Sequence, residues 1–157
     1  MKRDPLVIRA DASHLEALVA LRYRWRIEES KEAGLSLEEF AARFADWYAA
    51  HAASHHPYLV SLDDVAIGCA WLMVVDRIPG PGKFLRRAGI VQSVYVAPEH
   101  RNHGVGEAML RVLVDDARAM GLEYLSVHPS ARSPSLYERV GFVGAEQTLE
   151  LRLGPVA

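Results

Sequence analysis

Residues 90–127 change from one structural period to another, and this change constrains the fold more than any other feature of the chain. The stretch IVQSVYV, at residues 90–96, is apolar and rich in β-branched residues and is followed by Pro98, which is typical of a strand. From Val105 to Met120 apolar residues recur at helical spacing, and Gly121 ends the pattern. The next stretch, LEYLSVH, is again typical of a strand. A strand, a helix and a strand in this order predict an α/β domain.

The rest of the sequence extends this alternation. Further strands are predicted at residues 6–10, in both halves of 58–75 and at 148–153, and helices at 13–30, from residue 36 onward and at 133–141. The two strands within 58–75 are predicted to turn at Asp63 and Asp64. The stretch 76–89 holds two prolines and three glycines, which indicates a loop. No linker interrupts the pattern, so one domain with a mixed sheet is predicted over residues 1–157.

Two of the predicted helices begin with a capping signal. Ser13 with Glu16, and Ser36 with Glu39, have the spacing of a capping box, in which two side chains bond to free amides at a helix start. The helix that begins at Ser36 is also predicted to carry an aromatic face, formed by Phe40, Phe44, Trp47 and Tyr48.

The composition excludes several classes of protein. The net charge of -2 argues against a protein that binds nucleic acid through bulk positive charge. No apolar stretch is long enough to cross a membrane, and the first residues lack a signal-peptide pattern. The single cysteine, Cys69, cannot form an intramolecular disulfide, as is usual in a reducing cytoplasm. We therefore expect a cytoplasmic protein that binds neither nucleic acid nor a membrane.

The segment HRNHGVGEAML, at residues 100–110, places Gly104 and Gly106 where the strand at 90–96 gives way to the helix. A helix start offers free backbone amides and a partial positive charge, and glycines let an anion approach closely. Two common phosphate motifs are excluded, because Met109 replaces the third small residue of the dinucleotide fingerprint and no Gly-Lys-Ser/Thr follows. The segment is either a pyrophosphate-binding turn or a turn that needs glycine for its geometry alone.

The residues RNHGVG, 101–106, resemble the acyl-CoA-binding motif Arg/Gln-x-x-Gly-x-Gly/Ala of the GNAT superfamily of N-acetyltransferases. Downstream, PSLYERVGF resembles that family's LY-x-x-x-GF segment, and the order of predicted elements is also similar. The resemblance implies an α/β, single-domain GNAT-like fold with a mixed, mostly antiparallel sheet flanked by helices. It also implies direct transfer of an acetyl group from acetyl-CoA to a primary amine, on a small molecule or a peptide, in a ternary complex. The family often forms dimers, so a homodimer is one assembly that the resemblance allows.

The resemblance further assigns residues to the cofactor. It implies that the pantetheine arm pairs with the main chain of Val94, Tyr95 and Val96. The pyrophosphate would bind at the backbone amides of Arg101, Asn102, His103, Gly104, Val105, Gly106 and Glu107. Ser130, which stands where relatives often carry a cofactor-binding asparagine, and Ser133 complete the cofactor set. Tyr137 is the implied general acid, because a phenol with a pKa of roughly 10 is protonated at neutral pH.

One departure from the family concerns the base. Many relatives carry a glutamate where this chain has Gln92, and a carboxamide cannot accept the amine proton. Strand alternation predicts Gln92, Val94 and Val96 on one face, so that Gln92 points into the site. His128 is a candidate base because its ordinary pKa lies near neutral pH. The alternatives are a His128 bonded to nearby backbone and an amine that loses its proton without enzymatic help.

The family builds its acceptor pocket largely from the first two helices. Arg22, Trp25, Arg26, Glu28 and Glu29 lie in that region, and Trp25, Arg26 and Glu29 are the predicted substrate-binding residues. The alternative is a charged, solvated helix face. No metal site is predicted at His51, His55 and His56, because no carboxylate or cysteine stands at ligand spacing. The missing glutamate keeps a second function open, a non-catalytic acyl-CoA-binding sensor or interaction module.

Overall fold

The computed structural model describes residues 3–129, 134–145 and 147–154. Its centre is a five-stranded sheet in which the strands lie side by side in chain order. The strands are β1 (Leu6–Arg9), β2 (His55–Leu62), β3 (Val65–Asp76), β4 (Arg87–Val96) and β5 (Leu125–Val127). Neighbours from β1 to β4 pair antiparallel, and β5 pairs parallel with β4. The predicted mixed, mostly antiparallel sheet is therefore confirmed.

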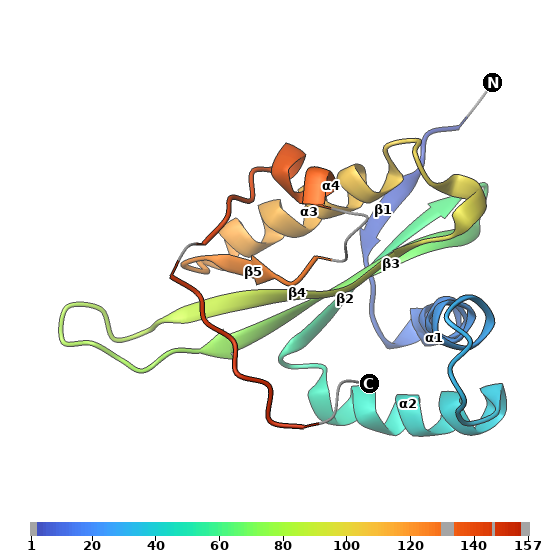
Figure 1. Ribbon diagram of the computed structural model, residues 1–157, viewed down its shortest axis with the longest axis horizontal. Helices are drawn as coiled ribbons and strands as arrows, with labels where there is room; N and C mark the ends of the chain where they lie inside the picture. The colour runs from blue at the N-terminus through green and yellow to red at the C-terminus, as the bar shows by residue number, and fades with distance from the viewer. Residues whose placement is uncertain (1–2, 130–133, 146, 155–157) are drawn as a thin grey trace.

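Helices cover both faces of the sheet (Figure 1). One face is covered by α1 (Leu15–Tyr23) and α2 (Leu37–His51), and the other by α3 (Val105–Ala119) and α4 (Pro134–Val140). Three short turns join these elements: η1 (Ala12–His14), the π-helical η2 (Arg24–Glu29), which continues α1, and η3 (Pro98–His100). None of the described helices is long and apolar enough to cross a membrane.

Each face of the sheet has its own apolar core. Leu72, Met109 and Leu113 belong to the core beneath α3, and Leu18, Tyr48 and Cys69 belong to the core beneath α1 and α2. A sheet that is buried on both faces explains why its strands read as nearly continuous apolar runs. The two cores fix the sheet between two helical layers, so the backbone of β4 is held firmly along most of its length.

The signals at the turns and helix starts were correct in two of three places. Ser36 and Glu39 form the expected capping box at the start of α2. Asp63 and Asp64 form the hairpin turn, with positive φ angles of 49° and 65°. The capping box at Ser13 and Glu16 was wrong, because the side chain of Asp11 accepts the Ser13 amide at 2.9 Å and His14 completes that cap. The Asp11 carboxylate thus starts a 3-10 turn before α1 begins.

The last predicted strand, at 148–153, is wrong, because these residues form no strand with the described part of the chain. Leu149, Leu151 and Leu153 alternate as a strand would, but they are 95%, 82% and 91% exposed. In Figure 1 the dark red segment after α4 runs away from the sheet as an extended coil. Apolar alternation stabilises a strand only when a neighbour pairs with it. At this side of the sheet β5 has only three residues.

Candidate functional site

A bulge interrupts β4 at Ser93. Tyr95 lies opposite Cys69 and Gln92 lies opposite Trp71, so two residues of β4 face one residue of β3. Ser93 has a φ of 53°, in the left-handed region that non-glycine residues seldom adopt. Backbone strain of this kind is often found at functional sites.

The bulge changes which side chains share a face. Gln92 faces α1 and α2 together with Tyr95, whereas Val94 and Val96 pack into the core beneath α3. The predicted alternation of Gln92, Val94 and Val96 onto one face was therefore wrong, because the extra residue shifts the phase of the strand.

Beyond the bulge, one edge of β4 is free. β5 pairs with β4 only from Gly89 to Val91, where Leu125, Ser126 and Val127 are the partners. After Val91, no strand of the described residues continues this pairing, although β3 still pairs on the other side. Apart from the Val96 carbonyl, which accepts from Arg101 Nε, the main-chain groups of residues 92–96 that point towards this edge are available to a ligand that offers amides and carbonyls.

The start of α3 lies directly after this edge (Figure 1). Gly104 is the residue before the helix and has a φ of 76°, and no side chain of the described residues caps the helix. The first bond inside the helix runs from the Ala108 amide to the Gly104 carbonyl at 3.0 Å. A Cβ at Gly106 would stand 3.3 Å from Leu136 Cδ2, so glycine there lets α3 approach α4. The exposed turn at 102–104 therefore leads into uncapped amides that suit an anion.

The side chain of Arg101 bonds to β4 and to η2 instead of pointing into solvent. Its Nε donates to the Val96 carbonyl at 2.8 Å, and its Nη2 donates to Glu29 Oε2 at 3.0 Å. The Tyr95 hydroxyl donates to the other oxygen of Glu29. Trp25 stacks on the Tyr95 ring with centroids 5.5 Å apart. Among the predicted cofactor residues, Arg101 thus contacts β4 and η2.

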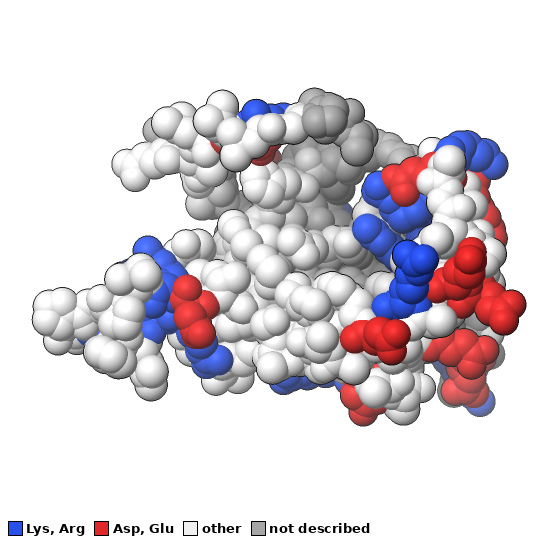
Figure 2. Space-filling model, turned by 90° about the horizontal axis from the view of Figure 1, so that it is seen from below, with Lys and Arg blue, Asp and Glu red and all other residues white. Residues whose placement is uncertain are grey.

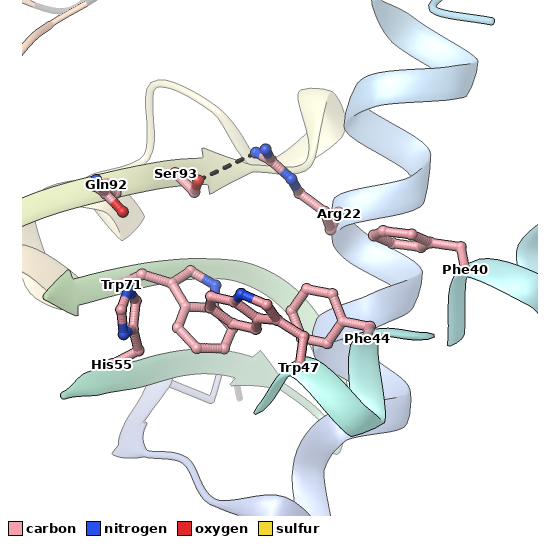
Figure 3. A pocket seen from close by; sticks show the side chains of 8 residues that line it. All are labelled: Arg22, Phe40, Phe44, Trp47, His55, Trp71, Gln92 and Ser93. Carbon is pink, nitrogen blue, oxygen red and sulfur yellow. Dashed lines mark hydrogen bonds between the residues drawn. The ribbon is translucent and has the colours of Figure 1, made fainter. Parts of the chain in front are cut away.

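A pocket of about 270 Å³ lies beside the bulge, between the sheet and the helices α1 and α2 (Figure 3). It is lined by Arg22, Phe40, Phe44, Trp47, His55, Trp71, Gln92 and Ser93. Gln92 is the one predicted site residue among these, and the predicted Trp25, Arg26 and Glu29 do not line it. Arg26 pairs with Glu32, and Glu29 is bonded to Tyr95 and Arg101.

Most residues of this pocket were not predicted from the sequence. The aromatic face of α2 was visible from its spacing, but Trp71 and His55 lie on β3 and β2, and only the strand register brings them beside Gln92. Trp71 lies directly opposite Gln92 in that register, which the sequence does not specify. Trp71 packs edge-on against both Phe44 and Trp47, so the two layers share one aromatic wall.

The two basic side chains that line the pocket, Arg22 and His55, differ in charge at neutral pH. Arg22 Nη1 donates to Ser93 Oγ at 3.1 Å, and burial and the charge of Arg26 lower the pKa of Arg22. Burial and the neighbouring His51 lower the pKa of His55 below its usual 6.5, so His55 is neutral at neutral pH. The rings of His51 and His55 both pack against Trp47. Within the described parts of the chain, no group of three metal-ligating side chains is assembled.

The other predicted catalytic residues lie outside this pocket. Tyr137 is buried on α4, edge-on to Phe142, and burial raises the pKa of its hydroxyl. His128 follows β5 with its side chain 75% exposed, and its Nδ1 lies 3.8 Å from Glu150 Oε2. Glu107 pairs with Arg111 at 2.7 Å and with Arg139 at 3.3 Å, which ties α3 to α4. The predicted cofactor residues Ser130 and Ser133 lie outside the described residues.

The charged surface around the site is mixed in sign. On the face shown in Figure 2, acidic and basic side chains are interleaved at the end of the molecule formed by α1, η2 and the start of α2. The middle of this face carries few charged side chains.

Known proteins are similar to this chain in sequence and in fold. A glucosamine 6-phosphate N-acetyltransferase of Trypanosoma brucei brucei is 30% identical over 87 residues, which cover 55% of this chain and 57% of that protein. An L-methionine sulfoximine/L-methionine sulfone acetyltransferase of Pseudomonas paraeruginosa is 31% identical over 99 residues, covering 61% of this chain and 56% of that protein. This chain thus spans less than two thirds of the length of these relatives.

A solved structure and a family model each match this chain over most of its length. The crystal structure of a predicted acetyltransferase from Clostridium acetobutylicum, solved with acetyl-CoA, has a TM-score of 0.74 at 23% identity and covers 95% of this chain and 96% of its own. The model of the acetyltransferase (GNAT) family matches residues 19–142, which include the bulged strand, the glycine turn and α4. The chain belongs to the GNAT family of acetyltransferases.

Proposed function

We propose that this chain is an acetyl-CoA-dependent N-acetyltransferase that transfers an acetyl group directly to a primary amine in a ternary complex. One observation carries the proposal: a free strand edge and a separate pocket adjoin the bulge of β4, and an uncapped helix start follows the end of the same strand. Relatives named for the acetylation of glucosamine 6-phosphate and of L-methionine sulfoximine support an amine as the acceptor.

The residues present fit acetyl-CoA. The amides of residues 105–107 and the exposed turn at 102–104 would hold its pyrophosphate, and the free edge of β4 would pair with the amides of its pantetheine arm. Arg101, through its bonds to Val96 and Glu29, would keep that turn in place without contacting a phosphate. When bound, acetyl-CoA supplies a thioester whose carbonyl carbon bonds to the amine nitrogen while the C–S bond breaks and CoA leaves as a thiol.

Two of this chain's side chains act on protons and orientation in the proposal. Tyr137 holds a proton on its hydroxyl at neutral pH, since burial raises its pKa, and donates that proton to the leaving sulfur. Gln92, at the rim of the pocket, orients the acceptor or a water through its amide, because it cannot serve as a base.

The amine proton has two routes, of which we propose the unassisted one. His128 is largely exposed and lies beside Glu150, outside the pocket lining. A pH profile of kcat/KM for two acceptors of different basicity separates the routes. If the acceptor loses its proton unaided, the acid limb follows the acceptor's own pKa and persists in His128→Ala. A limb that ignores the acceptor and disappears in His128→Ala would make His128 the base.

Calorimetry with CoA, together with an assay for released thiol, tests the proposed function. A glutamate at position 103 suits a helix start but repels a pyrophosphate, so His103→Glu should weaken CoA binding by about fivefold or more. His103→Gln, the neutral control, should bind CoA as the wild type does. CoA binding without thiol release for any amine would instead favour the sensor, and equal binding by both variants would misplace the anion site.

The assembly and the location are part of the same proposal. Leu149, Leu151 and Leu153 are exposed at strand spacing, which supports a homodimer that covers this segment. The single cysteine is buried, and burial raises the pKa of its thiol to about 12, so it is inert as a nucleophile. An inert, unpaired thiol suits the cytoplasmic location that we propose.

A further inference from the structure

Arg22 brings a positive charge to the acceptor pocket and forms no ion pair with the described residues: its guanidinium lies over the Trp25 ring at 5.2 Å, and Glu32 attracts it from beyond ion-pair distance. Its guanidinium bonds to the neutral hydroxyl of Ser93, and no carboxylate of the described residues lies within ion-pair distance. Two carboxylates of this region are already paired, Glu29 with Arg101 and Glu32 with Arg26, and the third, Glu28, is exposed and within ion-pair distance of no described cation. A partly buried guanidinium without a counter-charge is costly unless a ligand supplies one.

Apart from His55 and Gln92, the remaining side chains that line the pocket are aromatic and apolar. In Figure 3 the rings of Phe44, Trp47 and Trp71 lie together on one side of the space, across from Ser93 and the guanidinium of Arg22, and Phe40 lies apart from these three rings. At about 270 Å³ the pocket lies below the roughly 300–1,000 Å³ of sites that hold drug-sized ligands. It therefore suits a molecule of the size of one amino acid, with an anionic group at one end and an apolar group beside the aromatic rings.

We propose that Arg22 binds the carboxylate of a free α-amino acid whose apolar side chain packs between α2 and β3. This inference rests on the proposed function and names the substrate class of the same site. With the carboxylate at Arg22, the α-amine lies one carbon away, on the side of Ser93 and Gln92 where β4 bulges. His55, which is neutral, adds no positive charge to repel an ammonium group.

Two other classes of amine fit the pocket less well. An amine without an anionic group would place its ammonium charge near Arg22 and leave that cation uncompensated. An amino-sugar phosphate would supply the anion, but its hydroxyl groups would lose their hydrogen bonds to water against four aromatic walls.

The test compares L-phenylalanine with 2-phenylethylamine, which lacks only the carboxylate. Calorimetry with the full chain saturated with CoA measures both affinities, and the thiol assay measures both values of kcat/KM. We expect L-phenylalanine to bind about 10- to 100-fold more tightly, the range of a hydrogen bond to a charged group. Arg22→Gln should abolish this preference, and Arg22→Lys should restore part of it. Arg43→Gln, which removes an exposed arginine from α2, is the matched control.

Each outcome decides the proposal. Equal binding of the two probes by the wild type, a preference that survives Arg22→Gln, or tighter binding of glucosamine 6-phosphate would overturn it. If Arg22→Gln does not fold, the wild type and Arg22→Lys still decide. A titration of the chain with CoA alone separates the two claims: failure to bind CoA contradicts the proposed function, whereas acetylation of 2-phenylethylamine with no preference for L-phenylalanine contradicts only the role of Arg22.

Discussion

At the scale of single residues, Tyr137 has the properties of a proton donor. Its hydroxyl belongs to a buried side chain on α4, and burial raises its pKa, so the proton is present at neutral pH. Tyr137→Phe should lower kcat by about 10²- to 10⁴-fold, as loss of a general acid does, and leave CoA affinity nearly unchanged. Steady-state assays and calorimetry measure the two effects. An unchanged kcat under conditions where chemistry limits the rate would remove Tyr137 from the mechanism.

His55 connects the pocket to the stability of the fold. Burial lowers its pKa below 6.5, so the folded protein binds this proton more weakly than the unfolded chain does. The stabilising contribution is therefore complete above that pH and is lost as the pH falls through it. The free energy of unfolding in urea should drop between about pH 7.5 and about pH 5.5, and His55→Gln should reduce that drop.

Some pH dependence of the free energy of unfolding should remain in the His55→Gln variant. The pKa of His56 is also lowered by burial, so a smaller pH dependence should remain. A slope that is identical in the wild type and in His55→Gln would contradict the expectation.

At the scale of the elements, α2 depends on its capping box. The Ser36 hydroxyl accepts the Glu39 amide at 3.2 Å, and this helix carries three of the aromatic residues that line the pocket. Ser36→Ala should cost about 1 kcal/mol and lower Tm by about 2–4 °C. Ser36→Asp, which retains a capping oxygen, should stay close to the wild type. Thermal unfolding monitored by circular dichroism measures both, and an Ala variant as stable as the wild type would show that the cap is dispensable.

The sequence predicted the elements whose signals are local. The helix at Ser36, the turn at Asp63 and Asp64, and the glycine-led start of α3 depend on residues that are neighbours in the chain. The bulge at Ser93 depends on how β4 pairs with β3, and the pocket depends on the same register. The spacing of residues within one strand does not specify its register with the next strand. The prediction that Gln92 shares a face with Val94 and Val96 was therefore wrong, although Gln92 does line the pocket.

At the scale of the whole molecule, the end of the chain leaves apolar surface exposed. Leu149, Leu151 and Leu153 face solvent in a single chain, and strand pairing with a second copy would cover them. Leu151→Lys should shift the protein from dimer to monomer in sedimentation velocity, because burying an unpaired charge at an interface is costly. Lys83→Gln, on the exposed hairpin loop, serves as the control. A wild type that sediments as a monomer at high concentration would contradict the homodimer.

Arg101 has a kinetic consequence, because it joins two parts of the molecule that would meet different substrates. It bonds to the end of β4 and to Glu29 of η2, and η2 continues the helix that carries Arg22. If acetyl-CoA orders the loop before α3, the bonds of Arg101 should therefore also order η2 and α1, which carries the acceptor-binding Arg22. We expect an ordered sequence of addition with acetyl-CoA first, so that in calorimetry the acceptor binds only to the chain that already holds CoA. Arg101→Gln should make that order random because it cuts the connection, and it should also weaken CoA binding because it removes the bonds that hold the turn before α3.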